Sequence, residues 1–260
     1  MSFFADCKPA GIEHFFYSLV LSFIVIDFMK LNSPHSSLYN KTMKKEIQDE
    51  IAKAGIIAVL EIENEQNAVP LAKALFEGGI TVIELALRTS AAFPSISLIA
   101  KEVPQMYIGV GTIIEPGQAA KVKNEAGVRF GVSPGINPEI VKEAIAAELP
   151  FAPGIATPSE IEQAISLGCR VVKFFPAEGM GGLNFLKSIN APYNHLGVKY
   201  IPLGGVSTEN MASYAQFKPV LAIGGSWIAT KDLINAQNWA EITKRAKEAK
   251  EIWNNNRSPC

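Results

Sequence analysis

Short β-branched runs alternate with helical stretches from Ala54 onward, and this repeated order constrains the fold more than any other feature. Strands that alternate with helices are typical of parallel βαβ units. The runs that predict strands are Ile56–Leu60, Thr81–Leu87, Tyr107–Val110, Val128–Val132, Phe151–Ala152, Val171–Phe174, Lys199–Ile201 and Val220–Ile223. Eight such units predict an α/β protein with a single closed (β/α)8 barrel, the TIM-barrel architecture.

The stretches between these runs predict helices, because many begin at a capping residue or proline and several end in glycine. Thr157 followed by Pro158 and Glu160 matches a capping box. The predicted helices are 67–77, 92–102, 116–125, 138–147, 158–167, 183–189, 208–215 and 239–253. An open doubly wound sheet is disfavoured, because it more often has five or six strands and no GxGxxG fingerprint follows the first strand here.

Composition excludes several other classes of protein. The chain has 260 residues and a formal net charge of −1, so no basic excess indicates a nucleic-acid partner. Neither a disulfide framework nor a zinc-ligand spacing occurs among its three cysteines and three histidines. We therefore expect no metal site and no cofactor, a small-molecule ligand, and a reducing, cytoplasmic setting.

The first 42 residues differ from the rest. Residues 15–29 form an apolar run that Asp27 interrupts, and the run is shorter than the ~20 residues of a membrane-spanning helix. At Met43 an amphipathic helix pattern begins. We expect an N-terminal extension over residues 1–42 and a barrel domain over residues 43–260. A membrane anchor or targeting segment, or a part of the core, are the alternatives for the extension.

Two charged side chains share one face of the second predicted strand. Side chains alternate along a strand, so Glu84, Ala86 and Arg88 point the same way. The active site of a barrel lies at the carboxyl ends of its strands. Glu84 is therefore a candidate acid or base, and Arg88 a candidate clamp for a carboxylate, which its planar fork matches. The alternative is a structural ion pair.

A lysine lies within the apolar sixth predicted strand, in the run VVKFF. Lysine is almost never fully buried unless it is paired or functional, so Lys173 is a candidate nucleophile. An apolar setting favours the neutral amine, the form that attacks a carbonyl. The alternative is that Lys173 pairs with Glu84 or Glu178 as scaffolding.

Paired glycines follow the last two predicted strands, each pair close to a serine. This is where barrels frequently bind phosphate, through backbone N–H groups. The candidate phosphate-binding residues are Gly204, Gly205, Gly224, Gly225 and Ser226. Two tight glycine turns are the alternative. Thr112 and Pro134 stand at two further strand ends, where ordinary turn chemistry explains both.

Six motifs in this order resemble the 2-keto-3-deoxy-6-phosphogluconate (KDPG) and 4-hydroxy-2-oxoglutarate (KHG) aldolases. The resemblance extends from about Ile51 to the last helix and includes none of the first forty residues. The motifs are IELALRT (Ile83–Thr89), GVGT (Gly109–Thr112), GVSPG (Gly131–Gly135), VVKFFPAE (Val171–Glu178), PLGG (Pro202–Gly205) and IGGSW (Ile223–Trp227).

The resemblance implies a homotrimeric, cofactor-free class I aldolase with Lys173 as the Schiff-base lysine and Glu84 as the general acid and base. It implies that Arg88 and Thr112 hold the pyruvyl carboxylate and that Pro134 and Phe175 line the site. The five phosphate-binding candidates would bind the distal end of the substrate.

The reaction so implied cleaves KDPG to pyruvate and glyceraldehyde 3-phosphate, and KHG to pyruvate and glyoxylate. Two positions depart from the family pattern. Leu203 stands where relatives often carry threonine, and Glu61 follows the first strand where some relatives have an arginine. A phosphate-binding isomerase or epimerase barrel, and a non-catalytic barrel that binds a sugar acid, are the alternative functions.

Overall fold

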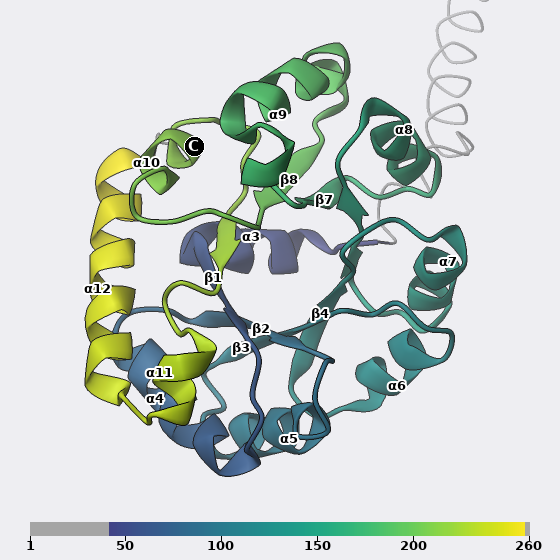
Figure 1. The fold of residues 1–260 in the computed structure, drawn as a ribbon. Helices are drawn as coiled ribbons and strands as arrows, with labels where there is room; N and C mark the ends of the chain where they lie inside the picture. The colour runs from purple at the N-terminus through teal and green to yellow at the C-terminus, as the bar shows by residue number, and fades with distance from the viewer. Residues whose placement is uncertain (1–41, 258–260) are drawn as a thin grey trace, which may run out of the picture. The chain divides into compact units, whose positions relative to one another are not determined.

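In the computed structural model, which describes residues 42–257, parallel strands follow one another around a ring in chain order (Figure 1). One sheet has the order β5-β4-β3-β2-β1-β9, and a second has the order β6-β7-β8. The strands are β1 (Ile56–Leu60), β2 (Val82–Ala86), β3 (Tyr107–Gly111), β4 (Val128–Val132), β5 (Phe151–Ala152), β6 (Gly154–Ile155), β7 (Val171–Phe174), β8 (Lys199–Pro202) and β9 (Ile223–Gly225).

Two junctions close these sheets into one barrel. β5 and β6 are halves of one strand, interrupted at Pro153, which has no N–H to donate. The Pro153 carbonyl still accepts from the Lys173 N–H at 2.9 Å. At the other junction, Tyr200 of β8 bridges Val220 in parallel, just before β9. Counting β5 and β6 as one strand, the ring has eight, which confirms the predicted (β/α)8 barrel.

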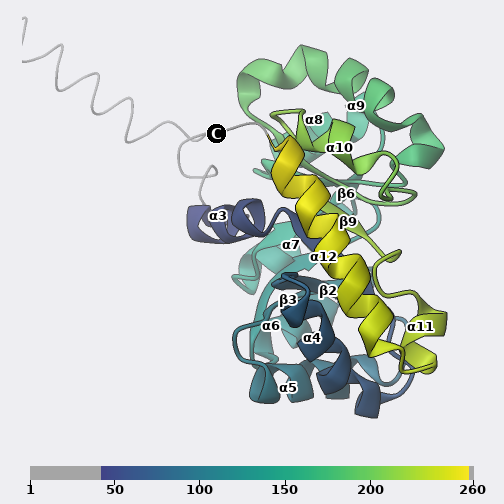
Figure 2. The same cartoon turned by 90° about the vertical axis from the view of Figure 1, so that its left-hand side faces the viewer.

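Helices surround the ring, and the sequence pattern predicts most of them. They are α4 (Ala68–Glu77), α5 (Ala92–Glu102), α6 (Gln118–Asn124), α7 (Pro138–Ala146), α8 (Pro158–Ser166), α9 (Gly182–Asn190), α10 (Met211–Ala215), α11 (Lys231–Asn235) and α12 (Trp239–Asn256). Short 3-10 helices cover Glu65–Asn67, Glu178–Met180 and Ala191–Leu196. α11 is an addition to the predicted set, and α12 packs along α4 and α10 (Figure 2).

The helix α3 (Lys45–Ala54) lies at one end of the barrel (Figure 2). Its buried residues Ile51 and Ala54 belong to the apolar cluster that fills the barrel interior, together with Ile57 and Phe130. Because α3 ends at Ala54 and leads through Gly55 directly into the first residue of β1, it covers the end of the barrel where the strands begin. The opposite end, where the strands finish, is left for a site.

Residues 1–41 of the expected extension, which include the apolar run at residues 15–29, lie outside the described residues. Within residues 42–257, no helix has the length and apolar character needed to cross a membrane.

A capping box starts α8, as the sequence predicts. The Thr157 side chain accepts from the Glu160 N–H, and the Glu160 carboxylate accepts from the Thr157 N–H at 2.8 Å. We expect Thr157→Ala to lower the free energy of unfolding by about 1 kcal/mol, because one N–H of the first turn loses its acceptor. Urea unfolding measures this change. Thr157→Ser keeps the hydroxyl, and an equal loss in that variant would contradict the capping explanation.

Candidate functional site

A buried ion pair crosses the barrel interior. The Lys173 ammonium on β7 lies 2.9 Å from Glu84 Oε1 on β2, and these strands stand on opposite sides of the ring. Only 8% of the Lys173 side chain and 3% of the Glu84 side chain are exposed. Two charges so far from water are costly to bury. The pair is therefore the feature of the interior that most needs an explanation beyond packing.

A cavity of about 380 Å³ opens above this pair, at the carboxyl ends of the strands. Its lining comes from seven different strands or the loops after them, so no single element makes the site. The lining residues are Val59, Glu84, Ala86, Arg88, Thr112, Pro134, Lys173, Phe175, Leu203, Gly204, Gly225 and Ser226. This is the location that barrel topology predicts for an active site.

Arg88 lies at the rim of this cavity, in the turn after β2. The strand alternation that predicts a shared face for Glu84 and Arg88 holds, since both side chains line the cavity. The Arg88 guanidinium also contacts a carboxylate that the sequence did not indicate as its partner. Its Nη2 lies 3.0 Å from Glu61 Oε2, and 53% of the Arg88 side chain is exposed.

Three of the other predicted residues form the cavity walls. Thr112, directly after β3, has φ 62°, a left-handed conformation that is uncommon for a residue other than glycine. The Phe175 ring centroid lies 5.5 Å from the Lys173 ammonium, within the range of a cation–π contact. Pro134 belongs to the loop after β4. The Phe175 ring thus lies beside the buried amine, and Pro134 lines the same cavity.

Gly204 and Gly205 lie in the turn after β8, whereas Gly224 and Gly225 are the last two residues of β9 itself. Gly204, Gly225 and Ser226 line the cavity. Gly205 and Gly224 are next to them in the chain but are not part of the lining. Gly204 and Gly205 have φ of 92° and 82°, a backbone conformation that residues with a side chain rarely adopt. Gly204 and Gly225, one from the turn and one from the strand end, place backbone groups rather than side chains at the edge of the cavity.

Comparison with known proteins decides the family. The model of the KDPG and KHG aldolases matches residues 47–245, which is most of the chain. This chain belongs to the KDPG and KHG aldolase family. The predicted family resemblance is thereby confirmed, and the Lys173–Glu84 pair lies within the matched region.

Individual relatives of this family agree. The chain is 40% identical over 211 residues to the KHG/KDPG aldolase of Escherichia coli K12, an alignment that covers 81% of this chain and 98% of that protein. A KDPG aldolase from Legionella pneumophila, crystallised with pyruvate as a covalent carbinolamine intermediate, is 37% identical with a TM-score of 0.73. That match covers 77% of this chain and 96% of the Legionella chain.

A third relative was crystallised with a phosphorylated acid. The KDPG aldolase of Zymomonas mobilis ZM4, determined with 3-phosphoglycerate, is 36% identical with a TM-score of 0.69. The match covers 79% of this chain and 95% of that chain.

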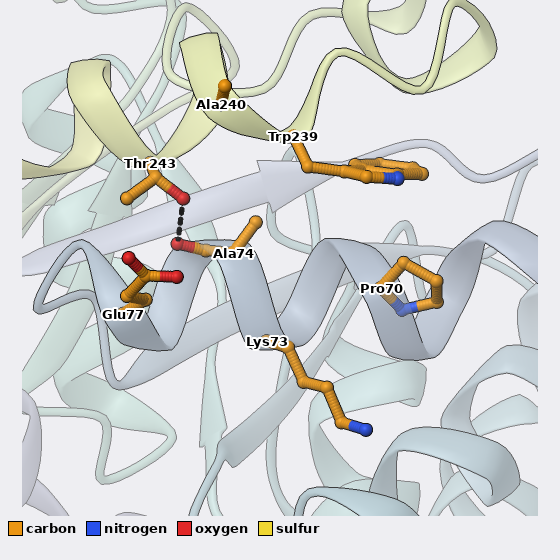
Figure 3. Close-up of a pocket in the computed structure, with 7 residues that line it drawn as sticks. All are labelled: Pro70, Lys73, Ala74, Glu77, Trp239, Ala240 and Thr243. Atoms are coloured by element: carbon orange, nitrogen blue, oxygen red, sulfur yellow. Dashed lines mark hydrogen bonds between the residues drawn. The ribbon is translucent and has the colours of Figure 1, made fainter.

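A larger cavity of about 560 Å³ lies outside the barrel of this KDPG/KHG-family chain, between α4 and α12 (Figure 3). Thr243 donates to the Ala74 carbonyl across this gap at 2.9 Å, and Lys73 points away from Trp239 (Figure 3). Its charged lining residues, Lys73 and Glu77, are both exposed. The cavity holds no buried reactive group, so volume alone does not make it the site.

Other reactive groups do not compete with Lys173. Cys169 is buried and free, and burial raises the pKa of its thiol to about 12, which keeps it protonated at neutral pH. Among residues 42–257, no group of three or more histidine, cysteine, aspartate or glutamate side chains is arranged to hold a metal ion.

Sequence reasoning missed one contact that positions the Glu84 carboxylate. An added Cβ at Gly111 would lie 2.1 Å from Glu84 Oε1, so the carboxylate occupies the space that a side chain would fill. The GVGT motif marks this glycine, but only the fold shows which side chain lies against it. Val59 and Ala86 were missed too, although strand alternation places both on the inner face.

Proposed function

We propose that this chain is a class I aldolase that cleaves KDPG to pyruvate and glyceraldehyde 3-phosphate. The observation that carries the proposal is the buried Lys173 amine, 2.9 Å from Glu84, at the bottom of an open cavity. A buried lysine beside a carboxylate that can accept its proton suits covalent chemistry with a carbonyl. The Legionella relative supports this, because a carbinolamine forms when an amine adds to a ketone.

Lys173 starts the reaction by attacking the C2 carbonyl carbon of the substrate. The ammonium first transfers a proton to Glu84, to which it already donates a hydrogen bond. Addition gives a carbinolamine, and Glu84 then returns its proton to the leaving hydroxyl, so that loss of water gives a protonated imine and leaves Glu84 as a carboxylate. The positive nitrogen then accepts the electron pair of the C3–C4 bond when that bond breaks.

Glu84 moves the protons of the later steps. It takes the proton of the C4 hydroxyl, directly or through one water, as the C3–C4 bond breaks and the aldehyde forms. The products of that step are the aldehyde and an enamine of pyruvate on Lys173. Glu84 then returns a proton to C3, and water hydrolyses the imine to release pyruvate and the free lysine.

The remaining lining residues hold the substrate. Arg88 and Thr112 bind the carboxylate next to C2, while Pro134 and Phe175 form the walls around the reacting carbon. The distal phosphate binds at Gly204, Gly225 and Ser226, supported from outside the lining by Gly205 and Gly224. The Zymomonas relative with 3-phosphoglycerate is consistent with a phosphorylated ligand in this family.

KHG is a second substrate in this proposal, cleaved to pyruvate and glyoxylate. The same lysine, acid and carboxylate clamp serve both reactions, because the two substrates share the part that becomes pyruvate. The buried Leu203 side chain lies in the cavity wall beside Gly204 and limits polar contacts to the distal end.

Assembly, location and domain boundary remain predictions. We propose a homotrimer in the cytoplasm, without a bound cofactor, with the aldolase domain over residues 43–260. Light scattering of the purified protein measures the number of subunits directly.

A phosphate-binding isomerase or epimerase is less well supported, because such a reaction gives no reason for a lysine buried at the bottom of the cavity. A non-catalytic sugar-acid-binding barrel is disfavoured for the same reason, since a binding protein gains nothing from burying Lys173 against Glu84.

Incubation with pyruvate and sodium borohydride tests the proposal. We expect one adduct per chain, found on Lys173 by intact-mass spectrometry and peptide mapping, because borohydride reduces the imine to a stable amine. Borohydride without pyruvate, and pyruvate without borohydride, serve as controls for nonspecific modification. Folded protein without an adduct would refute the Schiff-base mechanism.

A further inference from the structure

Two cations and two carboxylates form an ion-pair network beside the cavity. Glu61, directly after β1, uses both of its oxygens: Oε2 lies 3.0 Å from Arg88 Nη2, and Oε1 lies 3.5 Å from Lys231 Nζ. Lys231 also contacts Glu63 Oε1 at 2.6 Å. Asn235 donates to the other Glu63 oxygen at 2.8 Å. Glu61 is thus the member of the network that joins Arg88 to the rest.

Strand geometry places Glu61 at the rim of the site. Val59 lines the cavity, and side chains two residues apart on a strand share a face, so Glu61 follows Val59 on the inner side. Val59 stands beside Glu84 in the β1–β2 register. Glu61 therefore lies toward the cavity mouth from Glu84, on the strand next to the one that leads into Arg88.

We propose that Glu61 is an internal competitor for Arg88 that sets the affinity of the site for the carboxylate of 2-keto acids. The inference rests on the proposed role of Arg88 as the carboxylate clamp. In the free protein the Glu61 carboxylate is paired with the Arg88 guanidinium, and a substrate carboxylate binds Arg88 by displacing the Glu61 carboxylate. Glu61 is then a specificity-determining residue, because it weakens binding of every ligand that depends on Arg88.

Lys231 makes this exchange possible. When Glu61 loses Arg88 it keeps the Lys231 ammonium, so its charge is not left alone. The Arg88 side chain is 53% exposed and that of Glu61 26%, and half-exposed pairs of this kind are weak. Glu61 therefore lowers the affinity without blocking the site.

The test compares Glu61→Gln with Glu63→Gln. Both variants remove one carboxylate from the Lys231 network, but within the described residues Glu63 contacts Lys231 and Asn235 and forms no ion pair with Arg88, so Glu63→Gln is the matched control. The measurement is the pyruvate concentration that gives half-maximal trapping of Lys173 by borohydride. We expect Glu61→Gln to lower this concentration about two- to fivefold, and Glu63→Gln to leave it near the unmodified value.

Two further measurements separate competition from a structural effect. In 1 M NaCl the difference between Glu61→Gln and the unmodified protein should shrink toward none, because salt screens half-exposed charges. In an Arg88→Gln background, Glu61→Gln should change nothing, because the guanidinium for which it competes is gone.

The proposal is overturned by an unchanged or higher half-saturating concentration in Glu61→Gln, the latter meaning that Glu61 orients Arg88 for binding. An equal decrease in Glu63→Gln also overturns it, because general charge then explains the effect. If the unmodified protein forms no adduct at any pyruvate concentration, the proposed aldolase function fails and this inference fails with it. An adduct with no shift in Glu61→Gln rejects the inference alone.

Discussion

Lys173→Met is expected to form no pyruvate adduct under borohydride and to lose at least about 10⁴-fold in kcat for KDPG cleavage, the scale on which loss of a covalent nucleophile acts in other enzymes. The thioether of methionine cannot form an imine, so the electron sink of the proposed reaction disappears. Pyruvate release, coupled to lactate dehydrogenase and NADH oxidation, measures the rate. Activity within tenfold of the unmodified protein would refute Lys173 as the nucleophile.

The same substitution should also destabilise the barrel, because it leaves the Glu84 carboxylate buried without its partner. Removal of one member of a buried ion pair typically costs about 3–5 kcal/mol. The double variant Lys173→Met/Glu84→Gln has no buried charge at this place and serves as the matched control. We expect it to be equally inactive but more stable than the single variant, as measured by urea unfolding.

These two readouts separate chemistry from folding. An inactive but stable double variant shows that activity is lost with the lysine and not with the fold. If the double variant is as unstable as Lys173→Met, loss of packing around the lysine stem, rather than the unpaired Glu84 charge, explains the destabilisation.

The sequence predicts the pair at the centre of the site because both residues violate the pattern around them. Lys173 interrupts an apolar strand that is buried at every position, and Glu84 does the same on β2. The alternation of strands and helices predicts that both strands belong to one barrel, and in the structure they face each other across the ring. The positions of polar residues in buried strands can therefore be predicted from the fold and the strand register alone.

The rim of the cavity is less predictable for a physical reason. Glu61 and Arg88 are partly exposed and lie just beyond the ends of β1 and β2, where strand alternation predicts the side that each faces but not the partner that each side chain contacts. Lys231 reaches Glu61 from α11, a five-residue helix whose sequence has too little periodicity to predict. Contacts among long side chains on loops depend on backbone details that composition and spacing do not contain.

The contact between Gly111 and Glu84 is partly predictable, because the sequence motif marks the glycine but only the fold shows the side chain that lies against it. A substitution of Gly111 should have a large effect on activity. We expect Gly111→Ala to lower kcat for aldol cleavage by about 10²–10³-fold, because the new methyl group would lie 2.1 Å from Glu84 Oε1 and 2.8 Å from its Cδ. The carboxylate must leave this position, which is also the one that holds it 2.9 Å from Lys173. Proton transfer then loses its geometry while the nucleophile remains.

The pyruvate adduct distinguishes this result from a folding defect. Gly111→Ala should still be trapped at Lys173 by borohydride, although more slowly, whereas an unfolded protein would not be. Gly135→Ala is the matched control, because an added Cβ there meets no atom within 4 Å although Gly135 follows Pro134 of the cavity wall. We expect that control to keep nearly full activity.

A shorter acid should partly restore the site that Gly111→Ala crowds. Aspartate lacks one methylene group, so in Gly111→Ala/Glu84→Asp the carboxylate can fit beside the new methyl group. The double variant should be more active than Gly111→Ala, even though Glu84→Asp alone should be less active than the unmodified enzyme, a coupling that independent sites do not show. Simple additivity of the two losses would mean that Gly111 acts through the β3 backbone, not through the position of Glu84.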